Sequence, residues 1–129
     1  MRPILLLSLC YLLAACASQS ADSPPPKAEA RIAPVYVSEP VPHDSDDPAI
    51  WLHPTDPARS LVVGTDKSEK EGGLYVFDLK GKLVRAVPGL DRPNNVDIAY
   101  GMVAGGDTFD IAVCSERVAE RLRVFRLPD

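Results

Sequence analysis

The chain has 129 residues, of which 46% are hydrophobic and 25% charged, values that fit at most one ordinary globular domain. Its net charge of -4 argues against a broad nucleic-acid-binding surface. Thirteen prolines and eight glycines interrupt the sequence, which argues against long helices and favours short strands joined by turns.

The first residues have the layout of an export signal. Arg2 precedes an apolar run at residues 4–13 that is too short for a membrane span, and small residues follow. We therefore expect a signal peptide over residues 1–15. The stretch LAAC resembles a bacterial lipobox ending at Cys16, which implies a lipidated cysteine at the mature N-terminus. Ala17 then favours the outer membrane, whereas the alternative is ordinary signal cleavage with an incidental thiol.

Residues 16–33 are rich in Ala, Ser and Pro, and we interpret them as a tether between the membrane and a domain at 34–129. The predicted location is outside the cytoplasm, as an outer-membrane lipoprotein or a periplasmic or extracellular protein. Beyond the signal and the lipid site only Cys114 remains, so no internal disulfide is expected. Its apolar neighbours predict a small buried hydrophobic residue.

From Ala33 onward the chain is a series of short apolar runs bounded by Pro, Gly, Asp or Asn, which predicts strands. Lys80 and Gly81 separate two such runs and favour a tight hairpin. The expected strands are 34–37, 49–53, 60–65, 73–79, 82–87, 95–100, 109–115 and 121–127.

These runs repeat along the chain. DDPAIW from Asp46 aligns with NNVDIA from Asn94 at an offset of 48, VVGTDK aligns with AVCSER at 50, and LYVFDL aligns with LRVFRL at 48. A period near 50 residues with four strands per unit is typical of propeller blades. The alternative is chance similarity among strands that share a preference for Val, Ile and Phe.

The repeat predicts an all-β protein with the first one to two blades of a β-propeller. The first unit has four expected strands over residues 48–87, whereas the second has three. Because propellers have about four to eight blades, we expect this chain to be a truncated part of one. Unpaired strand edges and half-covered faces would then favour self-association or partial disorder.

Equivalent positions of the two units carry the same kinds of polar group, oxygen donors in one place and cations in another. They are Asp46 and Asp47 with Asn94 and Asn95, and Lys67 with Arg117. Asp and Asn oxygens suit calcium, and Lys and Arg beside such ions suit phosphate. Since Pro48 forces Asp47 into an extended conformation, we expect Asp46 and Asp47 to point to opposite faces and to serve different ions.

Four stretches, DSDDPAIWLHPTDPARSLVVGTDK, GGLYVFDLKGK, RPNNVDIAYG and DIAVCSER, resemble the opening blades of the β-propeller phytases. The resemblance runs from about His43 to Leu127 in order and with matching spacing. It implies six blades around a channel that holds several calcium ions, where phytate is hydrolysed.

The resemblance implies a role for six residues. Asp46 would hold the catalytic calcium, Asp47, Asn94 and the backbone carbonyl of Val96 would hold a more structural calcium, and Lys67 and Arg117 would bind phosphate. The other acidic positions of the family lie in later blades, so we expect little or no activity from this chain alone.

The implied reaction is hydrolysis of phosphate monoesters by calcium-activated water, with phytate or calcium phytate as substrate. No obligate protein partner is indicated. Two alternatives remain at this point, a non-catalytic propeller lipoprotein and a lactonase-like calcium propeller hydrolase. Lys67 and Arg117 distinguish a phosphatase from both alternatives, because a phosphatase needs these cations and the alternatives do not.

Overall fold

The computed structural model describes residues 32–128. The predicted signal peptide at 1–15, the lipid site at Cys16 and nearly all of the tether at 16–33 lie outside the described residues. Within residues 32–128, no helix has the length and apolar character that a membrane span requires.

The described part of the chain is almost entirely β structure, as the sequence predicts. One short 3-10 helix, η1 (Pro57–Arg59), is capped by the side chain of Asp56. The strands are β1 (Ser45–Trp51), β2 (Leu61–Asp66), β3 (Gly72–Asp78), β4 (Leu83–Leu90), β5 (Pro93–Ala104), β6 (Asp107–Glu116) and β7 (Arg121–Leu127).

The prediction of a strand at residues 34–37 is wrong, because this segment pairs with no strand. Only one backbone bond, from Glu39 N–H to the Gly81 carbonyl at 2.8 Å, ties the segment to the sheet. The carboxylate of Glu39 accepts from Leu83 N–H at 3.1 Å, so a side chain takes the donor that a paired strand would use. Residues 32–42 are therefore irregular.

The hairpin predicted at Lys80 and Gly81 is confirmed. Gly81 has φ +82°, a conformation that favours glycine, and its N–H bonds to the Asp78 carbonyl at 2.9 Å. The Asp78 carboxylate also accepts from the N–H groups of Lys80 and Lys82, at 2.8 and 2.9 Å. The turn is thus held by its own backbone and by one acidic side chain.

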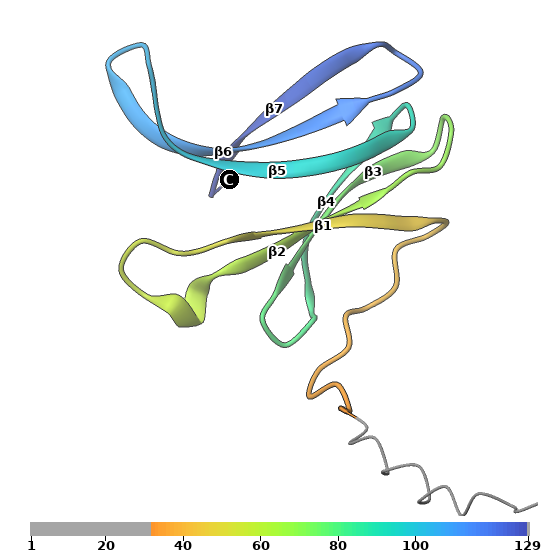
Figure 1. Cartoon of the computed structure of the whole chain (residues 1–129), viewed down its shortest axis with the longest axis horizontal. Helices are drawn as coiled ribbons and strands as arrows, with labels where there is room; N and C mark the ends of the chain where they lie inside the picture. The colour runs from red at the N-terminus through yellow and green to blue at the C-terminus, as the bar shows by residue number, and fades with distance from the viewer. Residues whose placement is uncertain (1–31, 129) are drawn as a thin grey trace, which may run out of the picture. The chain divides into compact units, whose positions relative to one another are not determined.

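The strands form two antiparallel sheets, β1-β2-β3-β4 and β5-β6-β7, each built from neighbours in sequence. We call them sheet A and sheet B. Figure 1 shows sheet B lying against sheet A. Each sheet has the up-and-down connection of a propeller blade.

The two sheets share one pairing register. Pro48 lies opposite Gly64 in sheet A, and Val96 lies opposite Cys114 in sheet B, so the first strands correspond at an offset of 48 and the second strands at 50. In both sheets the pairing is irregular just before this residue pair. The predicted repeat and both of its offsets are therefore confirmed.

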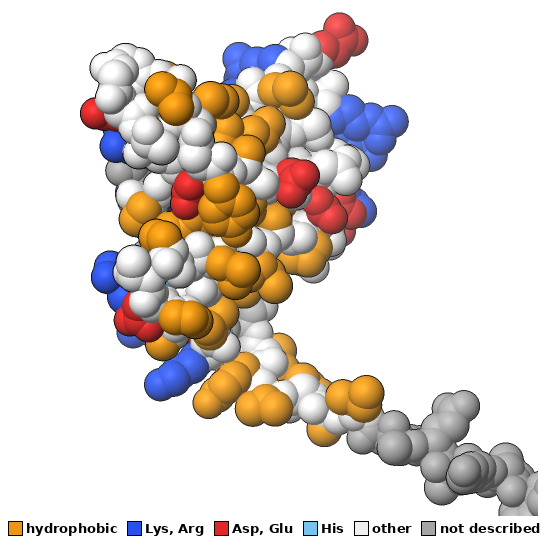
Figure 2. Space-filling view, turned by 60° about the vertical axis from the view of Figure 1, so that its left-hand side comes forward, with side chains coloured by type: hydrophobic (Ala, Val, Ile, Leu, Met, Phe, Trp, Pro, Cys, Tyr) orange, Lys and Arg blue, Asp and Glu red, His pale blue; other side chains and the backbone are white. Residues whose placement is uncertain are grey.

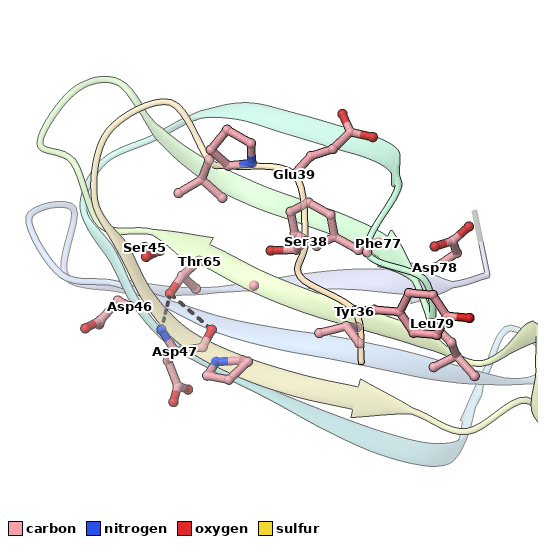
Figure 3. Close-up of a pocket in the computed structure, with 16 residues that line it drawn as sticks. Tyr36, Ser38, Glu39, Ser45, Asp46, Asp47, Thr65, Phe77, Asp78 and Leu79 are labelled. Carbon is pink, nitrogen blue, oxygen red and sulfur yellow. Dashed lines mark hydrogen bonds between the residues drawn. The ribbon is translucent and has the colours of Figure 1, made fainter. Parts of the chain in front are cut away.

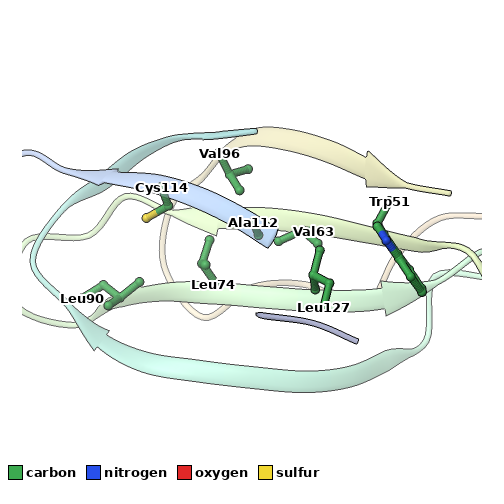
Figure 4. Close-up of a cluster of buried hydrophobic side chains, with 8 residues drawn as sticks. All are labelled: Trp51, Val63, Leu74, Leu90, Val96, Ala112, Cys114 and Leu127. Carbon is green, nitrogen blue, oxygen red and sulfur yellow. The ribbon is translucent and has the colours of Figure 1, made fainter. Parts of the chain in front are cut away.

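The core lies between the two sheets, as Figure 4 shows. Burying one large apolar side chain contributes about 1.5–3 kcal/mol, so this layer is a major source of stability. Its buried members are Trp51, Val63, Leu74, Leu90, Val96, Ala112, Cys114 and Leu127.

Cys114 is a core residue, as predicted. It is fully buried, and burial, with Glu116 as the second cause, raises the pKa of its thiol to about 11. Because the thiolate is the reactive form, this cysteine packs as a small apolar side chain and is chemically inert in the folded protein.

Hydrogen bonds that involve side chains join the two sheets near both ends of β1. The Trp51 indole N–H donates to the Asp110 carboxylate at 2.7 Å, and Val96 N–H donates to the Asp47 carboxylate at 3.0 Å. A sheet-to-sheet contact of apolar groups alone has little directional preference. The polar bonds add that direction and fix how β1 lies on sheet B.

Candidate functional site

Three loops meet at one end of the two sheets, on the right in Figure 1. They follow β2, connect β4 to β5, and follow β6. Arg92 of the middle loop links the other two, because its N–H donates to the Ser68 carbonyl at 3.2 Å and its carbonyl accepts from Arg117 N–H at 3.1 Å. We call this cluster, residues 67–71, 91–92 and 117–120, the strand-end rim.

Asp46 and Lys67 form an ion pair at the rim. Lys67 Nζ lies 2.8 Å from Asp46 Oδ1, and both side chains are partly exposed. The hydrogen bond to Asp46, with the charge of Asp44 next, raises the pKa of Lys67 above its ordinary value. Lys67 is therefore a full positive charge at neutral and mildly alkaline pH. The structure thus brings together two of the predicted site residues.

Arg117 is exposed at the equivalent point of sheet B. Lys67 N–H bonds to the Asp44 carbonyl, and Arg117 N–H makes the same kind of bond to the Arg92 carbonyl, so the repeat places both residues alike. Within residues 32–128, no hydrogen bond or ion pair engages the Arg117 guanidinium. All its donors are therefore available to a ligand that reaches this rim.

Asp47 faces sheet B, whereas Asp46 points elsewhere, and Figure 3 shows the two carboxylates diverging from β1. The prediction that they occupy opposite faces is confirmed by the alternating burial of this strand. Asp47 Oδ2 accepts from Val96 N–H at 3.0 Å, and Asp47 N–H donates to the Thr65 hydroxyl at 2.9 Å.

Asn94 and Val96 therefore lie near Asp47, as predicted for a shared site. Asn94 contributes its backbone carbonyl, which is 3.4 Å from the Thr65 hydroxyl, and its side-chain amide donates to Asn95 at 3.0 Å. The contact of Val96 with Asp47 is through its N–H group, not through the carbonyl that the resemblance implies. Thr65 is the buried centre of this arrangement.

Asp66 is a fully buried acid that the sequence analysis did not single out. Its carboxylate accepts three backbone N–H groups, from His43 at 2.9 Å, Asp44 at 3.0 Å and Ser68 at 3.1 Å. These bonds join the segment before β1 to the loop that follows β2. They fix the backbone on both sides of Lys67, which follows Asp66 directly.

Glu116 is the equivalent buried acid of sheet B, and its side chain is 1% exposed. It accepts from Asp91 N–H at 2.8 Å, and its two oxygens bond Arg121 at 2.7 and 3.1 Å. The hydrogen bond from Arg121, then the one from Asp91, lowers the pKa of Glu116 to about 2, with a smaller contribution from Arg123. Glu116 is thus ionised at neutral and mildly acidic pH, directly before Arg117.

The repeat itself contained the signal for these two acids. When VVGTDK is aligned with AVCSER, Asp66 matches Glu116, and each of these acids directly precedes one of the two cations. An acid of either length at the same point of both units indicates a shared requirement for an acceptor. The role of these two acids is easily missed in the sequence, because an acidic residue normally predicts an exposed side chain.

A pocket of about 420 Å³ lies between the irregular N-terminal segment and sheet A, as Figure 3 shows. Asp46 and Asp47 line it beside Tyr36, Phe77 and Asp78, and among residues 32–128 no lysine or arginine takes part in its lining. Because it carries acids without cations, this pocket does not suit a phosphate ester. The candidate phosphate site is the strand-end rim.

The oxygen donors near the rim fit calcium in kind but not in number. Calcium takes about six to eight oxygen ligands, and carboxylate, amide and carbonyl oxygens are its usual partners. Residues 32–128 contain no group of three or more His, Cys, Asp or Glu side chains arranged to hold a metal. Asp46, Asp47 and Asn94 would therefore supply only part of a coordination shell.

A model of the phytase family matches residues 3–127 of the chain. Together with the two blade-like sheets and the rim of cations, this match shows that the chain belongs to the phytase family, whose fold is a β-propeller. Over 73 residues it is 40% identical to the 3-phytase of Bacillus subtilis (strain 168), a match that covers 57% of this chain and 18% of that relative.

Family membership confirms the predicted resemblance and the predicted fold class. Phytases are phosphoric monoester hydrolases that act on phytate, so the class of chemistry suggested by the cations at the rim agrees with the family. The chain spans far less than the length of the relative, of which the match covers 18%.

Proposed function

We propose that this chain supplies the first phosphate-binding cations and the first calcium ligands of a propeller that hydrolyses phytate. The observation that carries the proposal is the equivalent placement of Lys67 and Arg117 at one end of two repeated sheets in a member of the phytase family. Neither a binding module without chemistry nor a lactonase requires cations there.

The two cations have complementary roles in this proposal. The Lys67 ammonium has three donors, of which the Asp46 carboxylate takes one, so the others are available to phosphate oxygens. Arg117 offers a planar fork that binds two phosphate oxygens at once. Asp66 and Glu116 hold the backbones that carry these two side chains, because each is fixed to the preceding loop.

Asp46 would hold a calcium ion close to the reacting phosphate, and Asp47, Asn94 and the Val96 carbonyl would hold a more structural one. Bound calcium would lower the pKa of a coordinated water and neutralise phosphate charge. Further oxygen ligands are needed from beyond these residues, so we expect calcium-dependent binding of phytate by this chain, with little or no release of phosphate.

Alanine at Lys67 or at Arg117 should weaken the binding of phytate in the presence of calcium by about tenfold each, because a hydrogen bond between charged groups contributes about 1.5–3 kcal/mol. Arg117→Lys should recover only part of the affinity, since the fork is lost. Isothermal titration with and without a calcium chelator measures both effects.

Lys80→Ala is the matched control, because Lys80 is an exposed lysine in the β3–β4 hairpin, away from the rim. Its affinity for phytate should equal that of the unchanged chain. Equal affinities for Lys67→Ala, Arg117→Ala and Lys80→Ala would contradict the assignment of the rim as the phosphate site.

For the N-terminus, we propose that Cys16 carries lipid and anchors the protein to the outer membrane. Several acyl chains give stable anchoring where one does not. Cys16→Ser should therefore move the protein from the membrane fraction to the soluble fraction of the cell envelope, and mass spectrometry should find no acylated N-terminal peptide. Recovery of the unaltered protein entirely in the soluble fraction would argue for ordinary signal cleavage.

A further inference from the structure

Arg92 lies in the middle loop of the strand-end rim, and its side chain has no part in the function proposed above. Its N–H donates to the Ser68 carbonyl at 3.2 Å, and its carbonyl accepts from Arg117 N–H at 3.1 Å. The backbone of Arg92 is therefore bonded to both of the loops that carry Lys67 and Arg117. Its side chain is 35% exposed, so a third cation reaches solvent at this rim.

The backbone of the rim contains an uncommon conformation. Among residues 32–128, three residues other than glycine have a positive φ, and all three lie in the rim: Lys70 at 70°, Arg92 at 54° and Glu120 at 51°. Residues with side chains rarely adopt this conformation, and it is often retained where a local arrangement serves a function. At Arg92 the N–H and the carbonyl are both bonded to neighbouring loops, so the backbone that carries the guanidinium is fixed.

The repeat shows that the charge at the position of Arg92 differs between the two sheets. Arg117 N–H bonds to the Arg92 carbonyl as Lys67 N–H bonds to the Asp44 carbonyl, so Arg92 is the counterpart of Asp44. In sheet A this position carries an acid, which partly offsets the charge of Lys67. In sheet B it carries a second cation, which adds to the charge of Arg117.

The Arg92 guanidinium has one weak partner and several available donors. Its Nη1 lies 2.6 Å from Glu69 Oε1, and the Glu69 side chain is 60% exposed. Within residues 32–128, no other hydrogen bond or ion pair engages this guanidinium, which has five N–H donors. An ion pair this exposed contributes little to stability, so a better acceptor can replace the carboxylate.

The guanidinium of Arg92 also lies close enough to Lys67 for its charge to act there. The hydrogen bond to Asp46 is the largest influence on the pKa of Lys67 and raises it, whereas the charge of Arg92 lowers it. Two cations that repel each other favour a shared anion between them, and a phosphate group carries more negative charge than a carboxylate.

The rim cations lie apart from the apolar surface. Figure 2 shows a face on which hydrophobic side chains gather in the middle and Lys and Arg side chains lie toward the margins. Lys67, Arg92 and Arg117 follow this distribution, because each stands in a loop just beyond a strand end. A phosphate group at the rim is therefore met by charged donors from three neighbouring loops.

We propose that Arg92 is a third phosphate-binding residue of the strand-end rim, and that Glu69 holds its guanidinium until a phosphate group displaces the carboxylate. This inference rests on the function proposed above, because it adds a residue to the same site. Its planar fork binds two phosphate oxygens, as that of Arg117 does. Glu69 is a competitor for this fork, and it keeps the fork at the rim while the site is empty.

The first test is Arg92→Asn in the full chain, measured by isothermal titration with phytate in the presence of calcium. Asparagine tolerates a positive φ better than most residues, so the backbone bonds to the two loops should remain. The affinity should fall about tenfold, because charged hydrogen bonds to phosphate are lost. Arg59→Asn is the matched control, since Arg59 is an exposed arginine in η1, between β1 and β2, and its affinity should not change.

The second test is Glu69→Gln, which removes the competing charge. The affinity for phytate should rise about two- to fivefold, in keeping with the small contribution of an exposed ion pair. In the double variant with Arg92→Asn, this gain should be largely lost, because Glu69 then has no guanidinium to hold.

Three results would overturn the proposal. If Arg92→Asn binds phytate as tightly as the unchanged chain while Lys67→Ala and Arg117→Ala bind weakly, Arg92 is not a ligand and the proposed function stands. If none of these three variants binds more weakly, the proposed function fails as well. An equal gain from Glu69→Gln with and without Arg92 would show that Glu69 acts by general repulsion and does not compete for Arg92.

Discussion

Replacing Asp66 with alanine is expected to lower the free energy of unfolding by about 3 kcal/mol, because three buried backbone donors lose their common acceptor. The cost exceeds that of an ordinary hydrogen bond, since unpaired N–H groups keep the full penalty of leaving water. The free energy of unfolding of Asp66→Asn should lie between those of the unchanged protein and of Asp66→Ala, because asparagine keeps one acceptor oxygen and adds a competing donor. Urea unfolding followed by the fluorescence of Trp51 measures the change.

Asp78→Ala is the control for this prediction. Asp78 also accepts two backbone N–H groups, but in a half-buried hairpin where water can replace it. We expect a loss of about 1 kcal/mol there. A loss for Asp66→Ala no larger than for Asp78→Ala would show that burial does not make the Asp66 carboxylate essential.

Trp51→Ala is expected to cost about 3–5 kcal/mol, because it removes the largest buried side chain between the sheets together with its bond to Asp110. Trp51→Phe keeps much of the packing and loses only the indole donor, which leaves the Asp110 carboxylate without this partner. We expect a loss of about 1–3 kcal/mol for that variant. Since Trp51 is the only tryptophan, unfolding must be followed by circular dichroism.

Ile50→Ala provides the comparison, because Ile50 is the neighbour of Trp51 on the opposite face of β1 and is 58% exposed. A change of about 0.5 kcal/mol or less is expected for such a surface position. If Trp51→Ala unfolds at the same urea concentration as Ile50→Ala, the contact between the sheets does not stabilise the fold.

Most of the fold was predictable, because the signal is carried by order and spacing. The offsets of 48 and 50 place Asp46 with Asn94 and Lys67 with Arg117, and the pairing registers agree. The divergence of Asp46 and Asp47 follows from strand geometry and from Pro48. These features depend on neighbours in sequence, which a reader of the sequence can see.

What sequence reasoning missed depends on neighbours in space. The segment 34–37 has strand-forming residues, but a strand also needs a partner strand alongside it, and composition does not show whether the chain will pair there. The burial of Asp66 and Glu116 depends on segments distant in sequence that deliver N–H donors, from His43 to Asp66 and from Asp91 to Glu116. The bond of Val96 N–H to Asp47 likewise arises only when the two sheets meet.

Hydrogen bonds hold sheet B to β1 at both ends of this strand, among them those from Trp51 to Asp110 and from Val96 to Asp47. Hydrogen bonds at one end of β1 alone would let the sheets rotate on each other, whereas bonds at both ends set their crossing angle. The separation between Lys67 and Arg117 then becomes a property of the whole sheet interface rather than of the rim. Damage at Trp51, at the far end of the strand, should therefore change the separation of the two cations at the proposed phosphate site without touching either of them.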